Sequence, residues 1–312
     1  MIYYFREGMT KHSLPIAFAL VGLFVYGSVA SAEMSSSSFL IRWDSVNTGG
    51  SDTGSSSSYQ LRDTVESVVA GRTSSSSYNL DQGYRGGVFD QVLSFDVRAQ
   101  NFSNVVSATA LSSLTVTVSS VSGVSVNDYI AIIQDRGVSQ VSAIGKVTSI
   151  GSSSLTVDSL TNGGTAPTVD GTNDYVYVLS GATVSYGTLS DSSVSTAIVS
   201  FEVSADSASG YVVQINDDGN LRSGSNDIDD VTDGAVAEGS EEFGARSSDT
   251  TLASSTFDTA DSAMTTSRQD VVTRSSVSMA DRSFVTFRAS ISTSTTAGSY
   301  GSVISFIASG NF

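Results

Sequence analysis

The feature that most limits the possible folds is a two-residue alternation of apolar and polar side chains. It recurs in four stretches of the chain, at 93–99, 197–203, 211–215 and 285–291. Because successive side chains of a β-strand point to opposite faces, this alternation predicts half-buried antiparallel strands. The only candidate for a helix is Asp261–Thr273, and it is short. We therefore expect an all-β protein whose main domain is an antiparallel β-sandwich.

The amino terminus has the pattern of a secretory signal peptide. Arg6 and Lys11 give a positive region, residues 14–26 are apolar, and small residues stand at Ala30 and Ala32. This pattern predicts cleavage after Ala32. The apolar run is shorter than the roughly 20 residues of a membrane-spanning helix. We expect residues 1–32 to be removed, leaving a secreted protein of the bacterial cell surface without a membrane span.

Composition excludes several classes of function. The full chain carries a net charge of −16, contains no Cys, and has a single His, His12, inside the predicted signal peptide. A strongly acidic chain has no basic face for nucleic acid. A mature chain without Cys or His cannot use Cys–His or Ser–His–Asp catalysis or a zinc site built on those residues. We predict no catalytic residues and no organic cofactor.

A Ser-rich repeat opens the predicted mature chain. The sequences SSSSFLI, SSSSYQL and SSSSYNL begin at Ser35, Ser55 and Ser74, and glycines separate them. Each repeat places an aliphatic residue two positions after an aromatic one, which is typical of a short strand after a polar turn. We predict that residues 33–87 form an arm of short strands; the alternative is a Ser-rich linker.

Residues 103–181 have a sequence pattern that is typical of an inserted domain. They contain their own set of short strands, and the segments 126–129 (VNDY) and 172–175 (TNDY) are similar turn-to-strand entries. We predict a small β-barrel-like domain inserted into a sandwich made of 88–102 and 182–312, with 182–190 as a sandwich strand. The alternative is one continuous sandwich.

The sharpest local feature is the acid-rich stretch 216–242, which holds nine acidic residues and one cation, Arg222. Calcium prefers six to eight oxygen ligands, and two oxygen-rich turns occur here. The spacing does not match an EF-hand loop. The predicted calcium ligands are Asp217, Asp218, Asn220, Asp227, Asp229 and Asp230. The alternative is a solvated acidic loop that keeps the protein soluble.

Four segments carry a family resemblance. They are Thr183–Ser190, Val199–Tyr211, Arg222–Gly244 and Ala297–Phe312, which ends in an AGSY turn and an apolar strand. Together they resemble secreted bacterial β-sandwich surface proteins of the pilin-like, spore-coat-U-like and WxL-like kinds. The resemblance implies a surface or fibre protein. The chain departs from these modules in lacking a WxL tripeptide and cysteines, so their modes of attachment do not carry over.

These observations together predict an exported, non-enzymatic structural or adhesive protein, such as a subunit of a surface layer, a fibre or an adhesin. We expect it to associate with itself or with other cell-surface components through sheet edges and the repeat arm. The alternative is a monomeric glycan-binding module or a carbohydrate-active enzyme.

Overall fold

The computed structural model describes residues 93–311 with their side chains. Before them, it describes the backbone of six short strands between residues 34 and 82. Contacts divide the chain into two units, Met1–Asp90 and Gln91–Phe312. The predicted signal peptide lies outside the described residues.

In the first unit the six strands form three antiparallel pairs. They are β1 (Met34–Ser35) with β2 (Leu40–Ile41), β3 (Gly49–Ser55) with β4 (Gln60–Val65), and β5 (Gly71–Ser74) with β6 (Asn79–Gln82). Each pair therefore forms its hydrogen bonds between strands that are close in sequence.

The prediction of an all-β, antiparallel fold is confirmed. No helix occurs among the described residues, and every pairing between named strands there is antiparallel. The suggested helix at 261–273 was wrong: the stretch is irregular and then enters β19 (Gln269–Arg274), which buries Val271 and Val272. Within 93–311, accordingly, no helix is long and apolar enough to cross a membrane.

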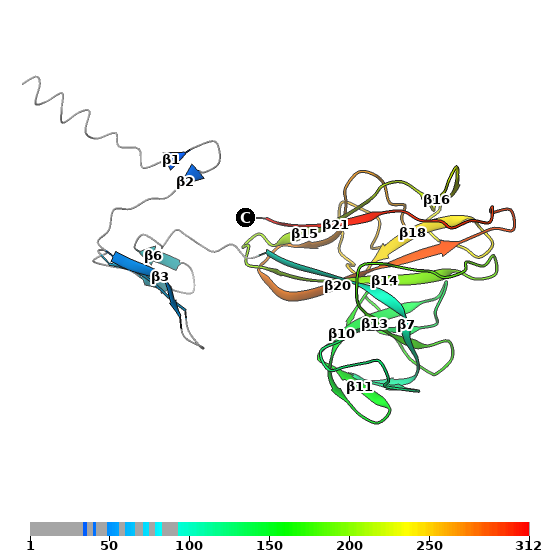
Figure 1. Cartoon of the computed structure of the whole chain (residues 1–312), viewed down its shortest axis with the longest axis horizontal. Helices are drawn as coiled ribbons and strands as arrows, with labels where there is room; N and C mark the ends of the chain where they lie inside the picture. The colour runs from blue at the N-terminus through cyan, green and yellow to red at the C-terminus, as the bar shows by residue number, and fades with distance from the viewer. Residues whose placement is uncertain are drawn as a thin grey trace, which may run out of the picture. The chain divides into compact units, whose positions relative to one another are not determined.

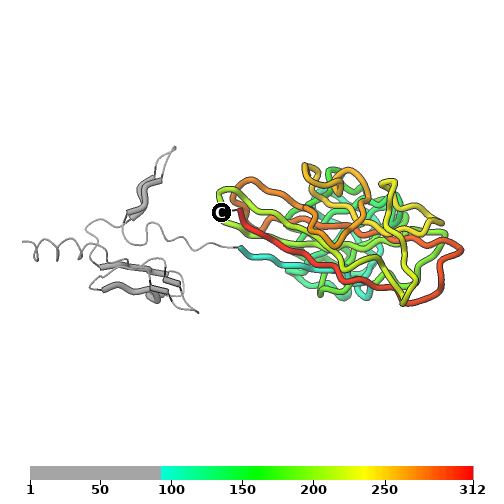
Figure 2. Tube along the Cα trace, turned by 90° about the horizontal axis from the view of Figure 1, so that it is seen from above, coloured from blue at the N-terminus to red at the C-terminus, as the bar shows by residue number. Residues whose placement is uncertain are grey.

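Two sheets make the sandwich (Figures 1 and 2). One is formed by β7 (Leu93–Ser112), β14 (Ser195–Ala205), β20 (Ser278–Ser290) and β18 (Glu242–Ser247), in that order. The other is formed by β19, β15 (Tyr211–Asp217) and β21 (Ile304–Gly310). β21 and β7 also contact each other between the sheets, so β21 and the start of β7 are edge strands on the same side of the sandwich.

The sandwich core follows from the alternation in the sequence. In β15, Tyr211, Val213 and Ile215 are fully buried, while the residues between them are half-exposed. They pack against the odd-numbered face of β14, where Phe201 contacts Phe306 of β21 with ring centroids 5.4 Å apart. Burial of such aromatic side chains is the largest favourable term in a core of this kind.

A second set of strands follows β7 in the chain. It consists of β8 (Thr115–Val118), β9 (Tyr129–Gln134), β10 (Val141–Ile150), β11 (Ser154–Val157), β12 (Thr161–Asn162) and β13 (Tyr175–Leu179). The pairings run from β7 to β13, β9, β10, β11 and β8 and return to β7. The arrangement is barrel-like, and its interior is an aliphatic cluster that includes Val116, Ile130 and Leu155.

The two strand sets share β7. Its residues 93–99 pair with β14 of the sandwich, and residues 100–112 pair with β13 and β8. The boundary expected at residue 103 therefore falls inside one 20-residue strand. The two NDY entries are structurally alike, since Asn127 and Asn173 have φ of 77° and 58°, and both precede a strand. Asn tolerates this left-handed conformation better than most residues.

The small β domain packs against the outer face of the sandwich sheet, as Figure 1 shows below β14 and β20. Ile198 and Phe284 of the sandwich join Tyr129 and Tyr177 of the small domain in one buried cluster. Arg282 also joins the two parts.

The Arg282 guanidinium binds Asp158 of the small domain at 2.7 Å and Glu202 of β14 at 2.8 Å. The Tyr129 hydroxyl donates to the same Glu202 at 2.8 Å. These contacts fix the small domain on the sandwich.

The sandwich has two ends. At the entry end, Leu93 pairs with Ala205, and Gly310 pairs with Tyr211. The start of β7 and the end of β21 therefore lie together, as Figure 2 shows. At the far end, Asp217 pairs with Ile304.

Candidate functional site

The acid-rich segment forms a hairpin at the far end. β16 (Leu221–Ser223) pairs with β17 (Asn226–Ile228), and both Leu221 and Ile228 are buried in the sandwich core. These two apolar anchors hold the hairpin in place, while Asp227 and Asp229 are exposed.

Three of the six predicted calcium ligands already have partners. Asp218 binds Arg222 at 2.6 Å and accepts the backbone N–H of Val303 at 2.8 Å. The amide of Asn220 donates to Asp227 at 3.1 Å. Asp229 is exposed. The hydrogen bonds within this group neutralise Asp218 and orient Asp227.

Asp217 and Asp230 differ from the other four. Asp217 is only 4% exposed, and neither of its carboxylate oxygens has a hydrogen-bond partner. One oxygen of Asp230, Oδ1, is also buried without a partner. Native proteins pair nearly all buried polar atoms, so these oxygens require an explanation.

The electrostatics of the pair agree with the geometry. Burial raises the pKa of Asp217, and the nearby N–H of Gly219 offsets part of this rise without a hydrogen bond of normal geometry. Burial, and then the charges of Asp217, Asp229 and Asp227, raise the pKa of Asp230 to about 6. The far end therefore contains a buried carboxylate, Asp217, and a half-buried one, Asp230, and the charge of Arg222 offsets part of the rise in the pKa of Asp217. Within 93–311, no three acidic or His side chains converge closely enough to hold a metal ion as they stand.

A groove of about 630 Å³ lies beside the hairpin. Its walls are the loops 184–189 and 295–302, and Phe243 and Phe287 line it as well. No lining residue is charged, although the chain is strongly acidic. Ligand pockets for small molecules have volumes in the range of roughly 300–1,000 Å³.

The sequence analysis missed this groove and misassigned one wall. Residues 182–190 were predicted to form a strand, but they are irregular, and Gly187 has φ of 68°. A signal was present: the tripeptide Ser-Tyr-Gly occurs at 185–187 and again at 299–301, once in each wall. Tyr300 donates its hydroxyl to the carbonyl of Thr296 at 2.6 Å, and burial raises the pKa of Tyr186.

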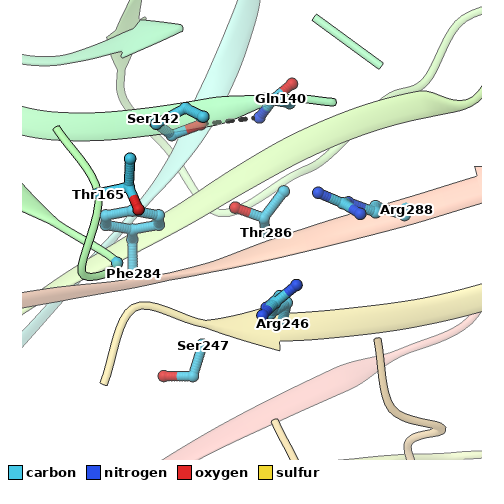
Figure 3. A pocket seen from close by; sticks show the side chains of 10 residues that line it. Gln140, Ser142, Thr165, Arg246, Ser247, Phe284, Thr286 and Arg288 are labelled. Atoms are coloured by element: carbon cyan, nitrogen blue, oxygen red, sulfur yellow. Dashed lines mark hydrogen bonds between the residues drawn. The ribbon is translucent and has the colours of Figure 1, made fainter. Parts of the chain in front are cut away.

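A smaller cavity of about 210 Å³ lies between the small domain and the sandwich (Figure 3). Arg246 and Arg288 reach it from neighbouring strands, β18 and β20. Asp261 neutralises Arg288 at 3.0 Å, and Arg246 donates to the carbonyl of Thr259 at 3.2 Å. Arg246 is nevertheless exposed, and the Nε of Arg288 is buried without a hydrogen-bond partner.

The remaining candidate is the open side of the sandwich. Within the described part of the chain, β21 pairs only with β15, and residues 93–98 of β7 pair only with β14. Phe95 and Val97 of β7 and Phe306 and Ala308 of β21 are only partly buried against the core. Val303, just before β21, is 64% exposed. The edge is therefore apolar and lacks a neighbouring strand.

Comparison of the chain with family models, with curated proteins and with solved structures gives no match. Any function must therefore be argued from the residues themselves.

Proposed function

We propose that the chain is an exported, non-enzymatic structural protein of the bacterial cell surface that associates with itself by adding a strand to the edge of β21. The observation that carries this proposal is the composition of that edge. Residues 304–310 (ISFIASG) contain no charge and no Pro. Exposed edge strands are usually protected by such residues, because an edge is a template for further pairing.

The backbone groups that would bind the new strand can be identified. Asp218 N donates to Val303 O at 3.0 Å, and Asn311 N donates to Gly210 O at 2.9 Å. Hydrogen-bonded pairs alternate in an antiparallel ladder, so Ser305, Ile307 and Ser309 face β15. The N–H and C=O groups of Ile304, Phe306, Ala308 and Gly310 therefore point to the open edge, ready to pair with another strand.

The difference between the two ends of the sandwich supports a role at a surface. The chain enters from the repeat arm at one end, and the groove and acidic hairpin lie at the other end. A partner that approaches the far end would meet the groove and the hairpin, which suits an adhesive role. Export rests on the signal-peptide pattern of residues 1–32.

Site-directed spin labelling tests strand addition, because the chain contains no Cys of its own. A label at Ser305→Cys, on an exposed position of β21, should lose mobility as protein concentration rises. The control is Ser152→Cys, exposed in a turn of the small domain, whose label should stay mobile. A β21 label that is equally mobile at all concentrations contradicts the proposal.

The groove supports a second candidate, a glycan-binding module. An uncharged groove that contains two tyrosines and many hydroxyl groups suits a neutral sugar. The test is calorimetric titration with neutral oligosaccharides. A binding module should lose affinity at least tenfold in Tyr300→Ala, and a Ser240→Ala control outside the groove should bind normally. Absence of binding to all the sugars tested counts against this candidate.

A further inference from the structure

The cavity between the small domain and the sandwich (Figure 3) differs in charge from the chain as a whole. Two of the residues that line it are arginines, Arg246 and Arg288, and none of them is acidic. The full chain, by contrast, carries a net charge of −16. A recess lined by one sign of charge attracts ligands of the opposite sign, so this cavity favours an anion.

The strand register explains why both arginines face this cavity. Phe287 and Ala245 pair with each other and lie in the sandwich core. Because successive side chains of a strand point to opposite faces, Thr286, Arg288 and Arg246 face the other side of the sheet, where the small domain packs. Arg246 pairs with Thr286, and Arg288 lies two residues further along β20. The two arginines are therefore diagonal neighbours, within reach of one ligand.

Arg288 has N–H groups that the fold does not use. Its side chain is 11% exposed, and Nη1 binds Asp261 at 3.0 Å. Nε is buried without a hydrogen-bond partner, and Nη2 forms no hydrogen bond with the described residues. A buried guanidinium with so few partners is exceptional in native proteins. It therefore has the capacity to bind a further acceptor.

Arg246 and two hydroxyl groups add further donors. Arg246 is exposed, donates one hydrogen bond to the carbonyl of Thr259, and forms no ion pair within 93–311. Ser142 and Thr286 are each 7% exposed. The Ser142 hydroxyl accepts the amide N–H of Gln140 at 2.9 Å, and neither hydroxyl donates a hydrogen bond to a described residue. The cavity therefore offers several donors to an acceptor.

We propose that this cavity binds an oxyanion, a carboxylate or a sulfate, between the guanidinium groups of Arg246 and Arg288. Arginine presents its N–H groups in a planar fork that matches oxyanions, and such charge-assisted hydrogen bonds are about twice as strong as neutral ones. A volume of about 210 Å³ is below the roughly 300–1,000 Å³ of ordinary small-molecule pockets, so the cavity suits one anionic group rather than an oligosaccharide. This site is independent of strand addition at β21.

A bound anion would also contact both parts of the unit. Ser142 and Thr165 belong to the small domain, whereas Arg246 and Arg288 belong to the sandwich. A ligand that binds only the folded protein raises its melting temperature. The oxyanion has two possible sources, a free inorganic ion and the carboxylate of an acidic sugar.

The test is calorimetric titration and thermal unfolding of residues 33–312 at constant ionic strength, with sodium sulfate, sodium glucuronate and, as the neutral counterpart, glucose. We expect at least one of the two anions to bind and to raise the melting temperature, and glucose to do neither. Arg246→Gln should weaken binding at least tenfold without changing the melting temperature of the free protein. Arg288→Lys should also weaken it, because it keeps a positive charge beside Asp261 but loses the planar fork.

The matched control is Arg268→Gln, which removes an exposed arginine outside the cavity. It should bind like the wild type. Binding of sulfate alone supports the proposal with an inorganic ion as the ligand, and binding of glucuronate alone supports it with a sugar carboxylate. A wild type that binds neither anion overturns the proposal. Unchanged binding in both cavity variants, or an equal loss in Arg268→Gln, also overturns it.

Discussion

The edge strands on the two sides of the sandwich differ in whether other segments of the chain cover them. On one side, the outer edge of β18 is covered by two irregular segments: Phe243 N donates to Asp229 O at 2.8 Å, and Ala245 and Ser262 exchange hydrogen bonds of 3.0 and 2.8 Å. On the other side, β21 and residues 93–98 of β7 have no such cover within 93–311. The same fold thus protects one edge and leaves the other available.

The covered side is also tied between sheets. The Ser247 hydroxyl of β18 donates to the carbonyl of Val271 in β19 at 2.5 Å, and Asp249 accepts the N–H of Thr273 at 2.9 Å. Side-chain hydrogen bonds therefore replace a missing neighbour strand on this side. The β18 side has many polar contacts, whereas residues 304–310 of β21 form no side-chain hydrogen bond in the described structure. We therefore expect a partner strand to bind at the open edge.

The largest expected effect comes from removing the cover of β18. Asp261 is 3% exposed, accepts the N–H of Val236 at 3.0 Å and binds Arg288 at 3.0 Å. Asp261→Ala leaves a buried guanidinium unpaired, which costs about 3–5 kcal/mol. Urea unfolding should show this loss together with new aggregation from the second edge.

The control for this experiment is Asp258→Ala, at a half-buried residue without an ion pair in the described structure. Its free energy of unfolding should change by less than about 0.5–1 kcal/mol. An equal loss in both variants would mean that Asp261 does not hold the cover in place.

The next effect concerns the open edge. Ala308→Pro removes an N–H that faces outward and leaves the ladder with β15 intact, a position where Pro is tolerated in strands. We expect self-association to weaken at least tenfold, as measured by sedimentation velocity. Ala308→Val keeps the N–H and should associate like the wild type. If the two variants associate equally, the N–H groups of β21 take no part.

A smaller effect concerns the ion pair between Asp158 of the small domain and Arg282 of β20. The hydrogen bonds from Arg282 lower the pKa of Asp158 from an ordinary 3.8 to about 2. A carboxyl with a lowered pKa contributes stability above its ordinary pKa and loses it as the pH falls through the folded-state value. The Asp158 side chain is 33% exposed, so this contribution is on the order of 1–2 kcal/mol after allowance for solvent screening.

The comparison that isolates this effect is wild type against Asp158→Asn. The difference between their free energies of unfolding should be present at pH 7 and shrink between about pH 4 and pH 2. A difference that does not change over this range would mean that the Asp158–Arg282 pair contributes nothing through its charge.

The sequence predicted the sheets well because a strand buried on one face has an apolar residue at every second position, as at Tyr211, Val213 and Ile215. The same period misled the analysis at 182–190, where Val184 and Tyr186 alternate with polar residues but line a groove. The continuous course of β7 was also missed, because Asn101, Ser103 and Asn104 suggest a loop.

The candidate sites were less predictable. Six oxygen-bearing residues of 217–230 look equivalent in sequence. Only the fold separates Asp217, which is buried without a hydrogen-bond partner, from Asp218, which Arg222 neutralises. Likewise, the AGSY ending indicated a closing strand, but whether that strand lies at an edge depends on pairings between residues far apart in the chain.

The most direct test of strand addition is light scattering behind size-exclusion chromatography, on residues 33–312 of the wild type and of Ala308→Pro. The account predicts a wild type larger than one chain, with the fraction of larger species increasing with concentration, and a variant that elutes as a folded monomer. A wild type that stays monomeric at every concentration, or assemblies that Ala308→Pro leaves unchanged, would contradict it.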